Sequence, residues 1–281
     1  MHVCLIMDKP ETPHHPVIAA VLQHLSATHT VRLLDLCTHS GLDAIAQEDE
    51  HPPADLYLLK AHAPQALEVA RHLEERGALI VNTWASTSSC QDRVTMAQRM
   101  RAAGLPWPRT WSLATLESLL THPELLVSVP WPLVLKSRYS RGGDLVVKVD
   151  SVEQVQALAA RWGQEPIIVQ ELVSSDGWDI KVWVIDHQVW AARRRSALDA
   201  QASAESFPVA PDDLPHAWAS LALEIGRVFN LRLYGVDLLI AEQGPVAVDV
   251  NAFPGFRGVP GASSALVALV EQIGRARRRT A

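Results

Sequence analysis

Three oxygen-bearing side chains stand out in this sequence because they belong to two neighbouring apolar runs. Asp237 lies in the run 236–240, Asp249 lies in the run 246–250, and Asn251 follows the second run. The polar segment between the runs fits a hairpin turn, which would bring the two acids side by side. The two-residue step from Asp249 to Asn251 places both side chains on one face of a strand. Carboxylate and amide oxygens suit Mg²⁺, so the pattern predicts a magnesium site that also holds the phosphates of a nucleotide.

Taken alone, the second part of this pattern has another interpretation. Aspartate and asparagine are common turn residues, so Asp249 and Asn251 also fit a strand end that begins the turn at Pro254 and Gly255. The motifs upstream decide between the two interpretations, and they favour the magnesium–nucleotide site.

Upstream, two apolar strands end in residues that suit a nucleotide. Lys136 ends the first strand and is interpreted either as a solvated strand end or as a charge directed at a phosphate. The turn that follows contains Gly142 and Gly143, which allow backbone amides to approach an anion closely. The other strand ends at Glu171 and Leu172, where an acid followed by a backbone amide is suited to bind the edge and amino group of an adenine. Together these residues favour a nucleotide site.

A further group of residues is cationic. Lys181 begins an apolar strand, and Arg193, Arg194 and Arg195 end its predicted hairpin partner. Antiparallel pairing returns the partner toward the start of the first strand, so we expect the arginines near Lys181, with Asp179 paired to one of them. The cluster is either a solvated charge run or a site for an anionic substrate and the phosphoryl group in transfer.

The elements that must position these residues begin with a small α/β layer. Strand and helix patterns alternate in the first third of the chain, which is typical of a parallel sheet. The expected strands are 3–7, 31–36, 55–60 and 78–82, and the expected helices lie near 16–27 and 64–76. A helix is then expected from 91 to 103, where Gly104 and the following proline-rich segment end it.

The rest of the chain predicts a small β-rich subdomain and a larger one. Two strands flank the glycine turn, and a helix at 151–162 with one more strand completes the small subdomain. Two hairpins and a helix at 214–229 form the larger one, in which 199–213 is expected to be a mobile loop. We expect an N-terminal α/β subdomain, a helical linker, the small subdomain and a C-terminal subdomain at 1–82, 83–130, 131–173 and 174–281.

Composition limits the function classes. The 281 residues are 48% hydrophobic and 20% charged, and no apolar run reaches the roughly 18 residues that a membrane span needs. The N-terminal apolar run is broken by Asp8 and Lys9, which indicates a strand rather than a signal peptide and predicts a cytoplasmic protein without a membrane partner. A net charge of −6 argues against nucleic acid, and the basic run 275–279 is interpreted as a solvated helix end. The three cysteines, Cys4, Cys37 and Cys90, form no CxxC pair and are interpreted as buried thiols.

The motifs occur in a fixed order, from Lys136 through the glycine turn and the arginine cluster to Asp249. This order resembles the ATP-grasp superfamily, in its RimK-like branch, over about residues 82–270. The resemblance implies a fold of α/β and α+β parts, in which an N-terminal parallel α/β subdomain precedes two α+β halves that grip ATP. It implies ATP and two Mg²⁺ ions as cofactors, with Mn²⁺ as an alternative ion. The partner would be a small-molecule or carrier-linked anionic acceptor, and a homo-oligomer is left open.

The resemblance also assigns roles to individual residues. The nucleotide-binding positions would be Arg93, Lys136, Gly142, Gly143, Gln170, Glu171, Leu172 and Asp179. The metal ligands would be Asp237, Asp249 and Asn251, and the catalytic cations would be Lys181 and Arg194. The substrate-binding positions would be Lys9, Lys60, Arg193, Arg194 and Gly255.

Two activities compete within this resemblance. The segment around Arg93 is similar to amino-acid ligases of the RimK and LysW-ligase type, which activate a carboxylate as an acyl phosphate before an amine displaces phosphate. The segment around Asp249 and the strand that ends at Lys60 are similar to inositol trisphosphate 5/6-kinases, which phosphorylate a hydroxyl. The ligases usually carry lysine at Arg93 and glutamate at Asp249, whereas the kinases carry a histidine-bearing loop that is absent here. We predict a carboxylate–amine ligase, with a kinase as the alternative and a non-catalytic ATP-binding protein as a third interpretation.

Overall fold

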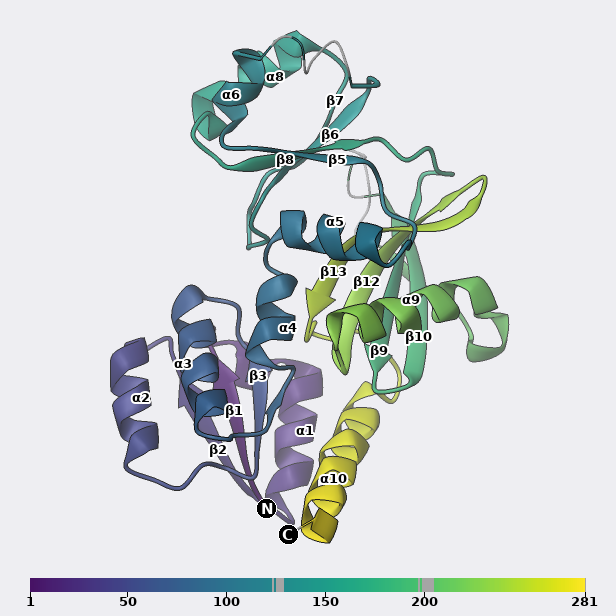
Figure 1. Cartoon of the computed structure of the whole chain (residues 1–281). Coiled ribbons are helices and arrows are strands. Elements are labelled where there is room, and N and C mark those ends of the chain that lie inside the picture. The colour runs from purple at the N-terminus through teal and green to yellow at the C-terminus, as the bar shows by residue number, and fades with distance from the viewer. Residues whose placement is uncertain (123, 125–128, 197, 199–204, 281) are drawn as a thin grey trace.

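The computed structural model describes residues 1–122, 124, 129–196, 198 and 205–280, and within them the strands form three sheets (Figure 1). The first sheet is parallel, with the strand order β2-β1-β3-β4. Its strands are β1 (His2–Met7), β2 (Thr30–Asp35), β3 (Leu56–Lys60) and β4 (Ile80–Val81). Its helices are α1 (Pro16–Ser26), α2 (Gly41–Asp49) and α3 (Pro64–Glu75). This layer has the parallel arrangement that the alternating pattern predicts, with α2 as an additional helix.

Alternate residues of β1 face opposite sides of this sheet, as a strand requires. Val3 and Leu5 pack with α1 and with the last helix of the chain, α10 (Ala262–Thr280). Cys4 and Ile6 face α2 and α3 in a separate cluster. The cluster on the α1 side also contains residues of a second sheet, so the N-terminal layer and that sheet share one hydrophobic core.

The second sheet is antiparallel and contains the two predicted hairpins. Its strand order is β11-β10-β9-β12-β13. The strands are β9 (Trp178–Ile185), β10 (Gln188–Arg195), β11 (Ser206–Pro208), β12 (Leu233–Ala241) and β13 (Gly244–Ala252). Two helices, α5 (Arg93–Ala102) and α9 (His216–Phe229), pack on one face of this sheet. One end of the other face joins the core shared with the first sheet, and the rest of that face is left for the site.

The side chain of Asn82 joins the N-terminal layer to the second sheet. Its amide nitrogen donates to the Leu233 carbonyl at 2.6 Å, and its amide oxygen accepts from the backbone N–H groups of Arg232 and Leu233 at 2.8 and 3.1 Å. Asn82 is buried, so these bonds are shielded from water. The connection fixes β12 relative to the first layer.

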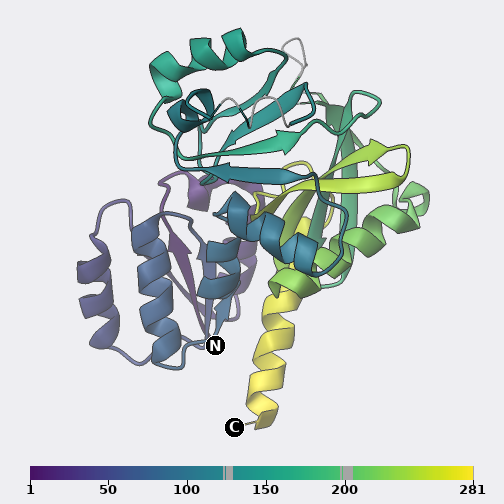
Figure 2. The ribbon, with the colours of Figure 1, turned by 45° about the horizontal axis from the view of Figure 1, so that its top comes forward.

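The third sheet is antiparallel and has its own core. Its strand order is β5-β8-β6-β7, and its helices are α6 (Leu116–Leu120) and α8 (Val152–Trp162). The strands are β5 (Thr110–Leu113), β6 (Leu133–Ser137), β7 (Val146–Val149) and β8 (Ile167–Glu171). The third sheet therefore begins at β5, before residue 131, where the small subdomain was expected to begin. Figures 1 and 2 show this sheet lying across the end of the second sheet, near β12 and β13.

The remaining expectations from the sequence differ from the structure only in detail. The helix expected from 91 to 103 corresponds to α5, and a short helix that the sequence analysis missed, α4 (Trp84–Ser89), precedes it. Residues 199–204 of the expected mobile loop lie outside the described part of the chain, and β11 follows them. Among the helices described, none is long and apolar enough to cross a membrane.

Candidate active site

The two acids that the hairpin was expected to bring together are direct neighbours in the second sheet. Asp237 of β12 and Asp249 of β13 are register partners, and a bulge follows Asp237. Val236 and Val250 on either side of these acids are buried in the core beneath α9. The alternation therefore directs both carboxylates to the face that the helices leave uncovered.

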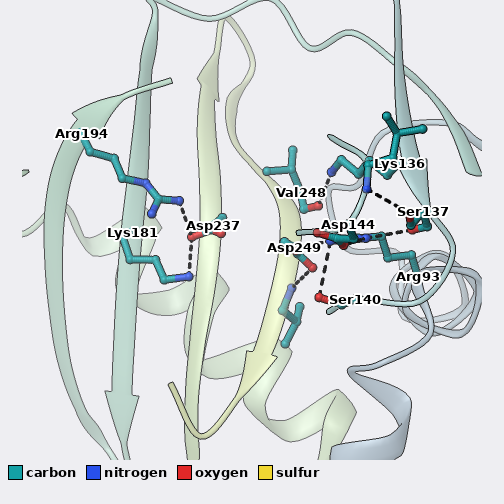
Figure 3. Close-up of polar contacts among 12 residues, drawn as sticks. Arg93, Lys136, Ser137, Ser140, Asp144, Lys181, Arg194, Asp237, Val248 and Asp249 are labelled. Atoms are coloured by element: carbon teal, nitrogen blue, oxygen red, sulfur yellow. Dashed lines mark hydrogen bonds and ion pairs between the residues drawn. The ribbon is translucent and has the colours of Figure 1, made fainter. Parts of the chain in front are cut away.

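Two cations approach Asp237 from one side (Figure 3). The Lys181 ammonium of β9 lies 2.7 Å from its Oδ1 atom, and the Arg194 guanidinium of β10 lies 3.3 Å from the same atom. Burial acts to raise the pKa of Asp237, but the neighbouring Lys181 and Arg194 hold this pKa below its usual value. The expected proximity to Lys181 is met by Arg194, whereas Arg193 and Arg195 lie over the ring of Trp178. The buried Asp179 of β9 is the register partner of Arg194, so a second carboxylate belongs to this group.

Two more cations approach from the opposite side and link the third sheet to Asp249 (Figure 3). Arg93 donates to the Ser137 carbonyl at 2.8 Å and forms ion pairs with Asp144 at 2.6 Å and Asp249 at 3.3 Å. Lys136 donates to the Val248 carbonyl at 2.9 Å. Burial lowers the pKa of Lys136 to about 8. These contacts join the second and third sheets at the site.

Replacing Arg93 with methionine is expected to destabilise the fold by about 3 kcal/mol, because the Asp144 carboxylate would remain largely buried without its partner. Chemical denaturation monitored by circular dichroism measures this change. Arg71→Met is the matched control, since Arg71 pairs with exposed Glu68 and Glu75 on α3 and should change stability by about 0.5 kcal/mol or less. Equal denaturation midpoints for the Arg93→Met variant and the wild type would contradict the structural role of Arg93.

A cavity of about 320 Å³ lies between the second and third sheets, and we call it the nucleotide cavity. It is lined by Arg93, Lys136, Gln170, Glu171, Leu172, Asp179, Arg194, Asp237 and Asp249, together with apolar residues that include Val134, Val146 and Leu239. Apolar walls with a few convergent polar groups are typical of a small-molecule site. The cavity thus collects the proposed nucleotide-binding residues other than the two glycines.

The end of β8 is fixed by β5, an element that the sequence analysis did not expect. The Glu171 carboxylate accepts the backbone N–H of Arg109 at 3.0 Å, and the buried Gln170 amide donates to the Thr110 hydroxyl at 3.0 Å. The backbone N–H of Glu171 also donates to the Arg109 carbonyl. These bonds hold the edge of the nucleotide cavity in one position.

A larger cavity of about 950 Å³ adjoins the site, and we call it the lysine cavity. Lys9, Lys60, Gly142, Asn251 and Gly255 all line it, so three of the proposed substrate residues lie together with the third proposed metal ligand. Gly143, which has a φ of 73°, forms the turn beside it. The two glycines thus belong to the lysine-cavity side of the site.

Arg193 is the proposed substrate residue that the fold places elsewhere. It lies on the opposite face of β10 from Arg194, because neighbouring strand residues point to opposite faces. Its guanidinium pairs with Asp176 at 3.1 Å and lies over the ring of Trp178. Its side chain lines neither of the two cavities described above.

The lysine cavity is lined by Lys60 and by two further titratable residues, Asp8 and His62, that the sequence analysis did not assign to the site. Burial, with a smaller contribution from Lys9, lowers the pKa of Lys60 to about 8. Burial and the nearby Lys60 lower the pKa of His62 to about 4, so this histidine is neutral. The Asp8 carboxylate is occupied by the backbone N–H groups of His62 and Ala63 at 2.6 and 2.7 Å. The two-residue step from Lys60 to His62 at the end of β3 was the available sequence signal.

Comparison with solved structures identifies the class of fold. A RimK domain protein ATP-grasp from Sphaerobacter thermophilus DSM 20745 has a TM-score of 0.73 and 19% identity, with 97% of this chain and 99% of that chain covered. D-alanine–D-alanine ligase from Bacillus anthracis, in complex with ATP, has a TM-score of 0.73 and 17% identity, with 100% of both chains covered. The molecule has the ATP-grasp fold, which confirms the predicted combination of α/β and α+β parts.

Sequence comparison then identifies the family. The model of the RimK-like ATP-grasp domain matches residues 110–269, more than half of the sequence, and the chain belongs to this family. A probable alpha-L-glutamate ligase of Legionella pneumophila (strain Corby) is 29% identical over 203 residues. That match covers 70% of this chain and 66% of the relative, so the chain spans slightly less than two thirds of the length of that protein.

Proposed function

We propose that this protein is an ATP-dependent carboxylate–amine ligase that joins an amino acid or peptide to a second substrate. The observation that carries the proposal is the convergence of Lys136, Arg93, Lys181 and Arg194 on the paired acids Asp237 and Asp249 beside an apolar-walled cavity. Paired acids with oppositely placed cations suit a bound triphosphate and the charge that develops during phosphoryl transfer.

The oxygen donors at this site fit Mg²⁺. Asp237, Asp249 and Asn251 would hold the ions, and the ions would supply charge neutralisation at the phosphates. Within the described residues no three histidine, cysteine, aspartate or glutamate side chains are placed to hold a metal ion by themselves, and the proposed ligands are two acids and one amide. Phosphate oxygens of ATP would therefore complete the coordination, which agrees with the preference of Mg²⁺ for mixed ligands.

The reaction that we propose has two steps. A carboxylate oxygen of one substrate attacks the γ-phosphorus of ATP, and the bond to the β-phosphate oxygen breaks to release ADP. An amine of the other substrate then attacks the acyl carbon, phosphate leaves, and the ammonium proton passes to solvent. Lys181 and Arg194 would orient the carboxylate, while Lys136 and Arg93 would hold the nucleotide phosphates.

The lysine cavity supports an anionic substrate. Lys9 and Lys60 line it, and the Lys60 ammonium lies 5.5 Å from the centre of the Phe253 ring. Charge complementarity and the name of the Legionella pneumophila relative support glutamate or another acidic amino acid here. The residues at 1–82 would thus form the subdomain that recognises this substrate, while 131–173, extended by β5, and 174–281 would bind ATP.

Incubation with ATP and Mg²⁺ tests the proposal. Two substrate pools are supplied, amino acids with short peptides and inositol phosphates, and ADP, free phosphate and product masses are measured. We expect equal amounts of ADP and free phosphate together with a condensation product from the first pool. ADP without free phosphate, together with an acceptor that gains one phosphoryl group, would replace the ligase with a kinase. Nucleotide binding without turnover in either pool would indicate a non-catalytic ATP-binding protein.

A further inference from the structure

His62 in the lysine cavity has no role in the chemistry proposed above. It lies two residues beyond Lys60, the last residue of β3, and both side chains line the cavity. A neutral histidine carries its proton on one ring nitrogen and accepts a hydrogen bond at the other. The position of that proton therefore decides which kind of ligand atom His62 can hold.

The Nδ1 atom of His62 accepts a hydrogen bond from the side chain of Gln91. The amide nitrogen of Gln91 lies 2.9 Å from Nδ1. An amide nitrogen only donates, so Nδ1 is the acceptor and carries no proton. Burial and the nearby Lys60 also favour the neutral ring, because they lower the pKa of His62 to about 4. The single proton of the ring is therefore on Nε2.

Gln91 is itself held by backbone hydrogen bonds on both sides. Its N–H donates to the Ser88 carbonyl of α4 at 3.0 Å, and its carbonyl accepts the N–H of Ser140 at 2.9 Å. Ser140 belongs to the turn between β6 and β7, so Gln91 connects this turn to the ring of His62. The Gln91 backbone thus has little freedom, and its side chain can keep His62 in one tautomer.

The Nε2 atom of His62 is open to a ligand. It has no hydrogen-bond partner within the described part of the chain, and it does not belong to the buried polar atoms that lack one. The ring lines the lysine cavity, so the Nε2–H group is accessible from there. Because this nitrogen carries the proton, the ligand atom that it meets must be an acceptor such as a carboxylate oxygen, and cannot be an ammonium group.

The charged groups around His62 suit an anionic acceptor. Lys60, Asp8 and Lys9 are the charged groups that act on the ring, and two ammonium groups against one carboxylate leave these three with a net positive charge. The Oδ2 atom of Asp8 already accepts the backbone N–H groups of His62 and Ala63. The other charged residues that line the cavity have partners of their own, Asp92 with Arg138 and Arg141 with Glu165.

We propose that His62 donates a hydrogen bond from Nε2 to the side-chain carboxylate of an acidic amino acid in the lysine cavity, and that Gln91 is the positioning residue that fixes this donor. The inference rests on the proposed ligase function, which supplies the substrate. Lys60 would pair with the same carboxylate.

This assignment orients the substrate. The α-carboxylate is one carbon away from the amine, whereas the side-chain carboxylate can be held on the other side of the cavity. A side-chain carboxylate at His62 and Lys60 leaves the amine for the side lined by Asn251, which lies two residues after Asp249 on β13. The amine would thus face the paired acids, where the acyl phosphate would form.

Nitrogen-15 NMR of the imidazole rings tests the tautomer in the protein without substrates. The chain has 12 histidines, so a His62→Leu variant assigns the signals of His62. We expect a protonated Nε2 and an unprotonated Nδ1 at pH 7. In the Gln91→Glu variant a carboxylate would accept from Nδ1, so the proton should move to Nδ1 and the pKa of His62 should rise. A wild-type ring protonated on Nδ1, or an unchanged ring in the Gln91→Glu variant, would remove the proposed role of Gln91.

Binding of L-glutamate tests the donor. The protein is saturated with ADP and Mg²⁺ and titrated by calorimetry with L-glutamate and L-glutamine. We expect the wild type to bind glutamate at least about tenfold more tightly than glutamine, because hydrogen bonds to an ionised acceptor are about twice as strong as neutral ones. His62→Leu should weaken glutamate about tenfold. His62→Gln, whose amide can still donate, should recover part of this loss.

A double-mutant cycle separates the action of Gln91 through His62 from a direct contact with the ligand. Gln91→Met should weaken glutamate about threefold in the wild-type background and leave it unchanged in the His62→Leu variant, where no ring remains to be positioned. His72→Leu is the matched control, since His72 is also hydrogen-bonded to a neighbouring side chain, Asp49, but lines neither the nucleotide cavity nor the lysine cavity. It should leave both affinities unchanged.

Several binding results would overturn the inference. These are equal binding of glutamate and glutamine by the wild type, full glutamate affinity in a His62→Leu variant that still binds ADP, and an equal effect of Gln91→Met in both backgrounds. Absence of glutamate binding while the wild type binds ADP would also overturn it. Any of these results together with a condensation product in the turnover assay would leave the ligase function standing. Absence of a condensation product would instead refute the ligase.

Discussion

The Asp249→Asn variant is expected to lose at least about a hundredfold in ATP turnover, which corresponds to roughly 3 kcal/mol of lost charge stabilisation at the phosphates. The fold should survive, because Arg93 keeps its ion pair with Asp144 when its weaker pair with Asp249 is lost. The stability change is expected to be about 1 kcal/mol or less. Initial rates of ADP formation, measured across a range of Mg²⁺ concentrations, check the first expectation, and thermal denaturation checks the second.

Asp176→Asn provides a matched control for this experiment. Asp176 also forms an ion pair with an arginine, Arg193, but neither residue lines the nucleotide cavity or the lysine cavity. Its replacement should leave turnover close to the wild-type rate. Wild-type turnover in the Asp249→Asn variant itself would remove Asp249 from the proposed metal site.

The Lys136→Met variant is expected to bind ATP at least about a hundredfold more weakly while folding more stably near pH 7. Burial lowers the pKa of Lys136 from 10.5 to about 8, so keeping the ammonium charged inside the folded protein costs up to about 3 kcal/mol. Methionine removes that cost, although the bond to the Val248 carbonyl is also lost. Calorimetric titration with ATP and chemical denaturation measure the two effects.

The pH dependence of stability distinguishes this explanation from a change in packing. Between about pH 8 and 10.5 the unfolded wild-type chain holds a proton on Lys136 that the folded protein has released, so this group makes wild-type stability rise with pH. The advantage of the Lys136→Met variant should therefore be full below pH 8 and vanish toward pH 10.5. A stability difference that stays constant from pH 7 to 10.5 would contradict the buried-charge explanation.

The hairpin of the site was predictable because its signals are local. Alternating apolar residues on both sides of a short polar turn determine the pairing of β12 with β13, and this pairing alone makes Asp237 and Asp249 neighbours. Because consecutive residues of a strand point to opposite faces, Arg193 and Arg194 must also lie on opposite faces of β10, and this was predictable from the sequence. Strand alternation therefore predicts which of the three arginines faces the site better than their shared positive charge does.

Other features depend on contacts that no local pattern specifies. The ion pair between Arg93 and Asp249 joins residues 156 positions apart and exists only once α5 packs on the second sheet. The strand β5 is four residues long, and its pairing with β8 becomes visible only in the assembled sheet. The neutral state of His62 likewise follows from burial near Lys60, which its own sequence neighbourhood does not reveal.

The distribution of hydrophobic cores has a mechanical consequence. The N-terminal layer and the second sheet share one core and are also joined by Asn82, so Lys9, Lys60 and the paired acids belong to a single frame. The third sheet has a core of its own and meets the acid hairpin through the polar contacts of Lys136 and Arg93. A polar contact of this kind can be replaced by a phosphate oxygen, whereas separating the shared core would expose apolar surface to water. We therefore expect the third sheet to move away from the other two when ATP enters and to close over ATP once it is bound. The frame formed by the first and second sheets would keep the two substrates in fixed positions relative to each other.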